Sequence, residues 1–215
     1  MSARIEAEKK LAAEAAAELV ADGMRVGLGT GSTVAHLLPA LAARRLEIRC
    51  VATSPRTERA ARELGLSVEP FADLDRLEIA IDGADQVSPG GWLVKGGGGA
   101  HTREKIVAAA AERFVVIGDS TKRVERIGPP VPLELHRFGL RATLREVGSA
   151  ELREGAEPTP DDGVLADYRG EVNEPARLAA WLGAVPGVVE HGLFSPALVS
   201  EVLIGRDGEV ERLAP

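Results

Sequence analysis

Short apolar runs alternate with longer amphipathic stretches over the first 120 residues. Residues 24–28, 47–54, 77–87 and 114–119 form runs with the length of buried strands. Residues 3–21, 32–45, 55–66 and 102–114 place apolar side chains at helical spacing, and they predict helices. This alternation predicts a parallel sheet with helices on both faces, in which the loops that follow the strands meet at one edge.

The pattern changes near Ile127. Pro129, Pro130 and Pro132 disfavour a continued helix and indicate a linker. Beyond it we expect strands at residues 131–135, 150–154, 163–169 and 188–194, and helices at 140–148 and 174–187. The order strand, helix, strand, strand, helix, strand predicts a small α+β unit of ferredoxin-like type. Residues 198–213 predict a hairpin that turns at Asp207-Gly208 and returns to the first sheet.

Composition narrows the classes of partner. Aromatic residues make up 3% of the chain and the net charge is −7, which argues against a nucleic-acid binder. No uncharged apolar run reaches about 18 residues, so we expect no membrane span. The first 20 residues resemble a helix rather than a secretion signal, and the single cysteine, Cys50, fits a reducing compartment. We therefore expect a cytoplasmic protein.

A glycine-rich loop, "GLGTGST", joins the first strand to the second helix. Glycines let the backbone turn sharply, and the helix N-terminus that follows offers free N–H groups and a partial positive charge. Thr30, Ser32 and Thr33 add hydroxyl donors, so the loop fits a phosphate monoester. Its spacing departs from both nucleotide-binding glycine motifs, which disfavours a nucleotide. A tight turn without a ligand is the alternative.

Two aspartates, Asp82 and Asp85, frame the end of the run at residues 77–87. Two carboxylates at one edge can divide acid and base roles, since proximity raises one pKa. They can also hold Mg²⁺, although the histidines, His36, His101, His136 and His191, complete no ligand set. A plain turn is the remaining reading. We expect no metal and no cofactor.

The segment "KGGGGAHTREKI" contains the densest group of candidate functional residues. Successive glycines allow backbone N–H groups to converge on a developing oxyanion, and Lys95 places a cation beside them. Glu104 falls in the first turn of the next helix, where it either faces the same edge or only complements the helix dipole. Together the three loops indicate proton transfer on a phosphorylated substrate.

Six blocks in this order resemble ribose-5-phosphate isomerases of type A: "GLGTGSTV", "TSPRTERAARELG", "DGADQV", "KGGGGAHTREKI", "GDSTK" and "PGVVEHGLF". The resemblance implies a Rossmann-like main domain at residues 1–128 and 200–215, and a ferredoxin-like lid at 129–199. It implies a metal-independent interconversion of D-ribose 5-phosphate and D-ribulose 5-phosphate through a cis-enediolate, in the non-oxidative pentose phosphate pathway. It also implies a homo-oligomer, either a dimer or a tetramer.

The same resemblance assigns roles to residues. Glu104 matches the general base, and Asp82, Asp85 and Lys95 complete the catalytic set, with either aspartate assisting ring opening. Lys9 or Lys10 is a further candidate to reach the phosphate. The substrate-binding positions implied are Thr30, Gly31, Ser32, Thr33, Asp82, Gly83, Ala84, Asp85, Lys95, Gly96, Gly97, Gly98 and Lys122.

Two residues depart from the family pattern. Gln86 stands where glutamate is usual, and His101 occupies a position that is usually apolar. Two alternative functions stay open at this point. One is a sugar-phosphate deaminase or lactonase on a related fold. The other is a sugar-phosphate sensor of a transcription regulator, which would carry a DNA-binding helix-turn-helix.

Overall fold

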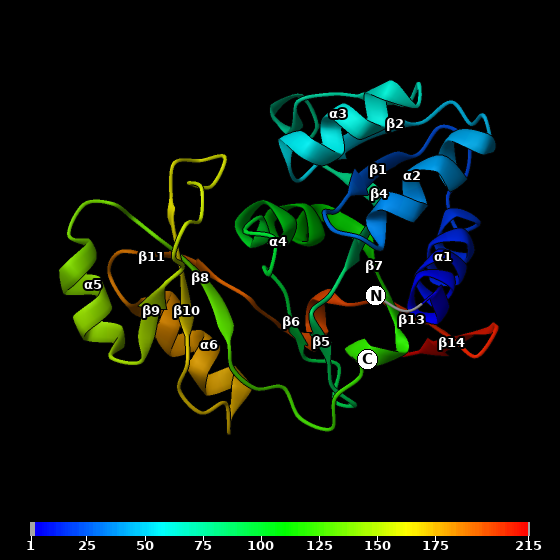
Figure 1. Ribbon diagram of the computed structural model, residues 1–215. Helices are drawn as coiled ribbons and strands as arrows, with labels where there is room; N and C mark the ends of the chain where they lie inside the picture. The colour runs from blue at the N-terminus through cyan, green and yellow to red at the C-terminus, as the bar shows by residue number, and fades with distance from the viewer. Residues whose placement is uncertain (1–2, 215) are drawn as a thin grey trace.

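A seven-stranded sheet forms the larger body of the protein in a computed structural model, which describes residues 3–214 (Figure 1). The strand order is β14-β13-β7-β4-β1-β2-β3, and all neighbours are parallel except β13 and β14. The strands are β1 (Arg25–Leu28), β2 (Arg49–Ala52), β3 (Ser67–Val68), β4 (Leu77–Gly83), β7 (Ala111–Asp119), β13 (Glu201–Arg206) and β14 (Glu209–Leu213). The mostly parallel α/β sheet expected from the sequence is confirmed.

Helices cover both faces of this sheet. Along β7, Val115 and Ile117 join the core beneath α1 (Ala3–Ala17) and α2 (Val34–Ala43). Phe114 and Val116 point the other way, into the core beneath α4 (His101–Ala110). The fourth helix of this body, α3 (Pro55–Glu63), starts where Ser54 accepts a hydrogen bond from the Thr57 amide. Burial on both faces explains the continuous apolar runs in the sequence.

The largest differences between predicted and observed helix ends are at α1 and α4. The first helix stops at Ala17 rather than residue 21. Residues 111–114, expected at the end of a helix, instead begin β7, because Ala111 pairs with Leu77 and Phe114 with Ala80 in the sheet. Sheet pairing and the burial of Phe114 outweigh the helical propensity of the alanine-rich segment.

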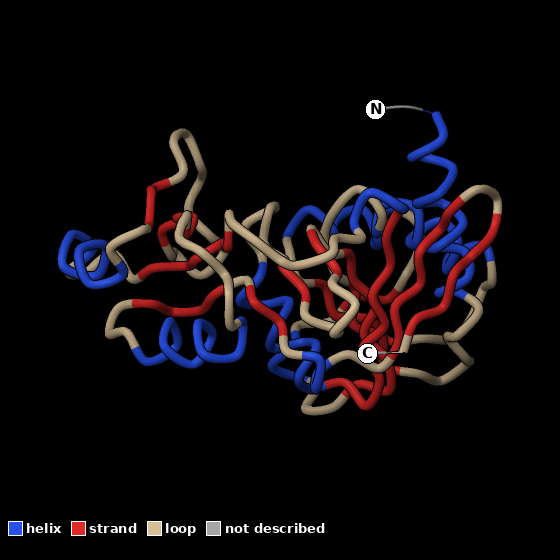
Figure 2. Tube along the Cα trace, turned by 90° about the horizontal axis from the view of Figure 1, so that it is seen from below, coloured by secondary structure: helices blue, strands red, loops and turns tan. Residues whose placement is uncertain are grey.

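A four-stranded antiparallel sheet forms the core of a smaller body, to the left in Figure 1. Its order is β11-β8-β10-β9, and Leu133, Val147 and Leu182 belong to its core with α5 and α6. The elements are β8 (Val131–Leu135), α5 (Leu140–Val147), β9 (Ala150–Leu152), β10 (Val164–Tyr168), α6 (Pro175–Ala184) and β11 (Val188–His191). Their succession along the chain is the predicted one. Figure 2 shows the two bodies side by side along the length of the molecule.

A third, three-stranded sheet lies between the two bodies (Figure 1). It consists of β5 (Gln86–Val87), β6 (Leu93–Val94) and β12 (Leu193–Phe194). The sequence predicted one strand over 188–194, but the strand is interrupted at Gly192. Gly192 passes so close to Lys95 that a Cβ atom added to it would lie 2.1 Å from the Lys95 carbonyl oxygen. The residues after that break therefore pair with β6, although they fall within the range expected for the small domain.

The C-terminal hairpin returns to the main sheet, as predicted. Asp207 and Gly208 both have positive φ, +49° and +87°, as a two-residue hairpin turn requires. The first strand of the hairpin, β13, pairs in parallel with β7, and the second strand, β14, forms the edge of the sheet. Among residues 3–214, no helix is both long enough and apolar enough to cross a bilayer.

Candidate active site

Four segments of the chain line one cavity at the carboxyl ends of the strands of the main sheet. They are the loop after β1, the loop after β4, the segment from β6 into the first turn of α4, and the turn after β7. The lining residues are Thr30, Gly31, Ser32, Thr33, Gly83, Ala84, Asp85, Lys95, Gly96, Gly97, Gly98, Glu104 and Lys122. Every substrate-binding position inferred from the sequence is therefore in this lining except Asp82, which is buried behind it.

The loop after β1 is shaped for close approach to β4. No residue larger than glycine fits at position 29, since a Cβ atom added there would lie 1.9 Å from the carboxyl group of Asp82. Gly31 has a φ of +132°, and the amide of Thr30 donates to Asp82 Oδ1 at 3.0 Å. Ser32 is exposed beside the N-terminus of α2. The backbone thus presents an anion-binding helix end to the cavity.

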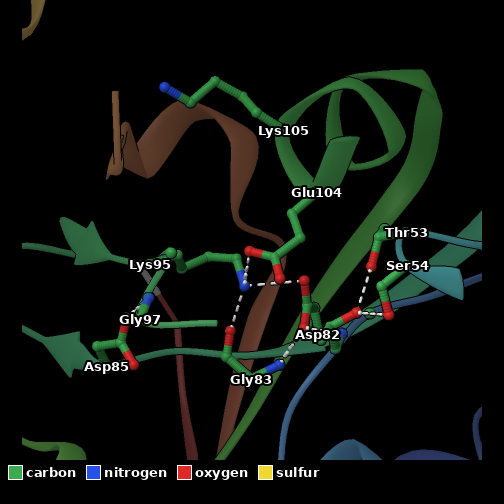
Figure 3. Close-up of polar contacts among 12 residues, drawn as sticks. Thr53, Ser54, Asp82, Gly83, Asp85, Lys95, Gly97, Glu104 and Lys105 are labelled. Atoms are coloured by element: carbon green, nitrogen blue, oxygen red, sulfur yellow. Dashed lines mark hydrogen bonds and ion pairs between the residues drawn. The ribbon is translucent and has the colours of Figure 1, made fainter. Parts of the chain in front are cut away.

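The hydroxyl of Thr30 has a different role from the one expected. It donates to Ser54 Oγ at 2.8 Å and lies 3.0 Å from Thr53 Oγ1 (Figure 3). The side chain therefore ties the loop to the end of β2 and the start of α3. This leaves the hydroxyls of Ser32 and Thr33 and the backbone amides that follow Thr30 as the candidate donors of the loop.

Lys95 lies between two buried carboxylates (Figure 3). Its ammonium is 2.8 Å from Asp82 Oδ2 and 3.1 Å from Glu104 Oε2, and it donates to the Gly83 carbonyl at 2.5 Å. Each of the three side chains is no more than 4% exposed. The carboxylate that faces Asp82 across the site is thus Glu104, not Asp85. A buried ammonium and two carboxylates cannot all be charged without leaving one negative charge uncompensated.

Burial shifts the proton affinity of this group. It is the main reason that the pKa of Glu104 is raised to about 8, and the charge of Asp82 raises that pKa further. Burial also raises the pKa of Asp82. Burial alone would lower the pKa of Lys95, but the two carboxylates outweigh it and hold the pKa above its ordinary value. Glu104 therefore exchanges its proton near neutral pH, as a general base must.

Asp85 is exposed at the mouth of the cavity, away from the buried group. Its Oδ2 accepts from the Gly97 amide at 2.7 Å, and the Gly99 amide donates to the Gly96 carbonyl at 3.0 Å. Two of the four glycine amides therefore already have acceptors within the protein. Gly98 lines the cavity and is exposed. Fewer of the four glycine amides are thus available to bind a ligand than the sequence suggested.

Sequence reasoning missed an aromatic support beneath Lys95. The ammonium groups of Lys95 and Lys105 lie 5.4 and 4.9 Å from the centre of the Phe194 ring. Lys105, the neighbour of Glu104 on α4, points away from the buried group (Figure 3). It donates a hydrogen bond to Glu190 Oε1 at 2.7 Å. The aromatic ring favours nearby cations and helps to hold the buried ammonium.

The two residues that depart from the family pattern both have structural partners. His101 is fully buried, burial lowers its pKa to about 3, and its ring fills the space beneath Gly96, where an added Cβ would lie 2.7 Å from Nδ1. Gln86 donates to the Gly128 carbonyl at 3.0 Å and accepts from the Gly128 amide at 2.8 Å. Glutamate at this position would lack the donor. Gln86 therefore fastens the end of the Asp85 loop to the linker.

The N-terminal lysines lie on α1, outside the lining. Lys9 is buried and forms an ion pair with Glu6 at 2.9 Å, and the exposed Lys10 lies 3.7 Å from Glu14. Within residues 3–214, no three histidine, cysteine, aspartate or glutamate side chains gather as a metal site would require.

Comparison with known proteins agrees with this arrangement. The family profile of ribose 5-phosphate isomerase A (phosphoriboisomerase A) matches residues 49–209. The chain belongs to the ribose 5-phosphate isomerase A family. A ribose-5-phosphate isomerase A from Caulobacter sp. (strain K31) is 46% identical over 97% of this chain and 98% of its own length.

Solved structures of ribose 5-phosphate isomerases have the same fold. The enzyme from Methanocaldococcus jannaschii superposes with a TM-score of 0.91 at 32% identity, over 96% of this chain and 98% of that one. A D-ribose-5-phosphate isomerase in complex with phospho-erythronic acid superposes with a TM-score of 0.93 at 31% identity, over the full length of both chains. Family membership favours the isomerase over the deaminase, lactonase and sensor alternatives.

The raised pKa of Glu104 predicts a pH-dependent gain in stability for Glu104→Gln. The folded state holds the Glu104 proton more tightly than the unfolded chain, so this stabilisation is complete below about pH 4.5 and is lost as the pH rises to about 8. Glutamine keeps the neutral form at every pH. We expect the variant to gain about 1–3 kcal/mol over wild type between pH 5 and pH 9, measured by urea unfolding.

The matched control is Glu63→Gln, which neutralises an exposed carboxylate at the end of α3. The Glu104→Gln difference is judged against this surface control over the same pH range. A Glu104→Gln difference that does not grow with pH beyond that of the control would show that Glu104 is not held protonated by the fold.

Proposed function

We propose that Glu104 is the general base of this isomerase, which interconverts D-ribose 5-phosphate and D-ribulose 5-phosphate in the pentose phosphate pathway. One observation carries the assignment: Glu104 is a buried carboxylate in the cavity lining, 3.1 Å from the Lys95 ammonium, with a pKa raised to about 8. A base with a pKa near the working pH can both remove and return a proton.

The phosphate of the sugar binds, in this proposal, at the N-terminus of α2. Gly31, Ser32 and Thr33 offer backbone N–H groups and a hydroxyl, and Lys122 adds a cation from the loop after β7. The related enzyme's complex with phospho-erythronic acid supports a phosphorylated ligand in this fold. Such a grip mainly positions the sugar for reaction.

Ring opening needs a group that exchanges a proton with the ring oxygen or the anomeric hydroxyl. Asp85 is exposed and lines the cavity, whereas Asp82 is buried behind it and bonded to two amides. This supports Asp85 as the group that meets the cyclic sugar. Asp82 then acts through Lys95, whose positive charge it balances, and through Glu104, whose pKa it raises.

The isomerisation proper moves one proton from C2 to C1. Glu104 removes the C2 proton, and the electron pair of that C–H bond forms the double bond of a cis-enediolate as the C1 carbonyl oxygen takes up negative charge. Lys95 and the Gly98 amide stabilise this oxyanion. Glu104 then returns the proton to C1, while the proton of the C2 hydroxyl passes to the C1 oxygen and the C2 oxygen becomes the carbonyl. The protein ends in its starting protonation state, and no step calls for a metal or cofactor.

The smaller body is proposed to act as a ferredoxin-like lid, within the predicted range 129–199. Its strand order, β11-β8-β10-β9, and its two helices support the assignment. Arg103 on α4 forms a two-pronged ion pair with Asp161 of this body, both hydrogen bonds being 2.7 Å. The lid therefore contacts the helix that carries Glu104.

A homodimer, or a tetramer, is supported by large apolar side chains on the surface of the small body. Phe138 is 87% exposed, and Leu152, Trp181 and Val189 are each more than a third exposed. Static light scattering on the purified chain should give the mass of two or four copies; the mass of a single chain would contradict the proposal. The cytoplasmic location stays a prediction.

Replacement of the base tests the mechanism most directly. We expect Glu104→Gln to lower kcat about 10²- to 10⁴-fold with a smaller change in KM, because glutamine keeps the shape but cannot accept the C2 proton. Ribulose 5-phosphate formation is measured with EDTA present, and wild type should keep its rate. Glu63→Gln serves as the control. Near-full turnover by Glu104→Gln, or loss of wild-type activity in EDTA, would refute the proposed chemistry.

Asp82→Asn should move the pH profile. The charge of Asp82 helps to keep the pKa of Glu104 high, so its removal should lower that pKa. We expect the rising limb of kcat/KM, near pH 8 in wild type, to shift down by at least about one pH unit, even though the plateau falls. A limb that stays in place would mean that another group controls it.

A further inference from the structure

Arg153 crosses from the small body to the glycine segment of the active site. It directly follows β9, and its Nη1 donates to the Gly96 carbonyl at 2.9 Å and to the Gly97 carbonyl at 3.2 Å. Its side chain is 18% exposed. One cation from the lid thus holds two consecutive carbonyls of the segment that lines the cavity.

Asp167 on β10 fixes the orientation of this arginine. Nε of Arg153 lies 3.1 Å from both carboxylate oxygens, and Nη2 lies 2.7 Å from Oδ1. The backbone amide of Arg153 also donates to the Leu165 carbonyl at 3.1 Å. Because the guanidinium is planar, fixing Nε and Nη2 against Asp167 also fixes the orientation of Nη1. In this orientation Nη1 points toward the carbonyls of Gly96 and Gly97.

The two carbonyls determine where the glycine amides point. In a trans peptide the C=O and N–H groups point in opposite directions. The Gly96 carbonyl shares a peptide plane with the Gly97 amide, which donates to Asp85. The Gly97 carbonyl shares a plane with the Gly98 amide. Holding both carbonyls on the lid side therefore turns both amides toward Asp85 and the cavity.

Glycine makes this restraint necessary. Gly96 has a φ of +105°, and glycines have no Cβ to restrict rotation of their peptide planes. Without the guanidinium, the peptide planes on either side of Gly97 would turn more freely. The positive charge at the carbonyl end also polarises each peptide, which strengthens the N–H as a donor.

We propose that Arg153 is a positioning residue for the isomerisation, acting from the lid to orient the Gly97 and Gly98 amides. The Gly98 amide then meets the developing oxyanion, and the Gly97 amide holds Asp85 in place for ring opening. Arg153 itself does not touch the sugar. The inference rests on the proposed oxyanion role of this segment, whereas Glu104→Gln tests the base separately.

Arg153→Met removes the guanidinium and keeps the apolar stem. We expect kcat to fall about 10- to 100-fold with KM changed less than about threefold, somewhat less than the loss of a whole oxyanion donor. Phospho-erythronic acid carries a carboxylate besides its phosphate. In this proposal the carboxylate lies at the oxyanion position, whereas inorganic phosphate needs only the N-terminus of α2. The inhibition constant for the acid should rise at least tenfold, and that for phosphate should stay within twofold.

Arg103→Met is the matched control. It breaks a guanidinium–carboxylate pair that also joins the main body to the lid, but it leaves the glycine carbonyls untouched. Its kcat and both inhibition constants should stay within about twofold of wild type. Asp167→Asn retains Arg153 while loosening its orientation, so it should show the same pattern in weaker form and provides the test if Arg153→Met does not fold.

Three results would overturn the proposal. The first is a kcat within twofold of wild type in Arg153→Met, or in Asp167→Asn if the former does not fold. The second is an equal loss of affinity for the acid and for phosphate. The third is a matching effect in Arg103→Met, which would show that any link between lid and main body suffices.

Discussion

The site depends on the ion pairs that the buried ammonium of Lys95 forms with Asp82 and Glu104. Removing an ion from water is costly, and a buried pair is tolerated only with close geometry and satisfied hydrogen bonds. Asp82 and the Gly83 carbonyl provide this geometry from the end of β4, and Glu104 completes it from the first turn of α4. The second carboxylate exceeds what one ammonium can neutralise, and burial together with this excess raises the pKa of Glu104 to about 8.

The surrounding structure keeps this charge imbalance in place. Gly29 lets the loop after β1 pack directly on the Asp82 carboxyl, so that the Thr30 amide joins the Gly83 amide in donating to Oδ1. Gly192 lets the chain pass the Lys95 carbonyl and place Phe194 near the ammonium. The small body adds the hydrogen bonds of Arg153 on the other side of the glycine segment. Elements remote in the sequence thus hold Lys95 and the glycines that follow it in place.

Much of this arrangement was predictable from the sequence. Alternating strands and helices gave the parallel sheet, and residues that follow parallel strands must gather at one edge. The sequence alone therefore predicts that the glycine loop after β1 and Asp82 at the end of β4 lie close together at this edge. The helix end at Ala110 was not predictable, because only pairing with β4 shows that Ala111 is extended.

Contacts that depend on the third dimension escaped prediction. Asp82 and Asp85 are close in sequence and looked like a pair, yet Asp82 faces Glu104 and Asp85 faces Gly97. The pairing of Arg153 with Asp167 requires the register of β9 against β10, which spacing along the chain does not provide. His101 and Gln86, without a role in the sequence, have packing and hydrogen-bond partners that come from distant segments.

The connectivity of the main sheet has a consequence for how the chain reaches this state. Strands β7 and β13 are parallel neighbours, yet the whole small body lies between them in the chain. Closing so long a loop costs chain entropy before any pairing offsets it. Within the small body, however, β8 and β11 are antiparallel neighbours, so the point where the chain enters lies beside the point where it leaves. If the small body folds first, it brings the ends of this long loop together. The strand β13 then lies close to the unpaired edge of β7 and pairs with it at a lower cost in chain entropy.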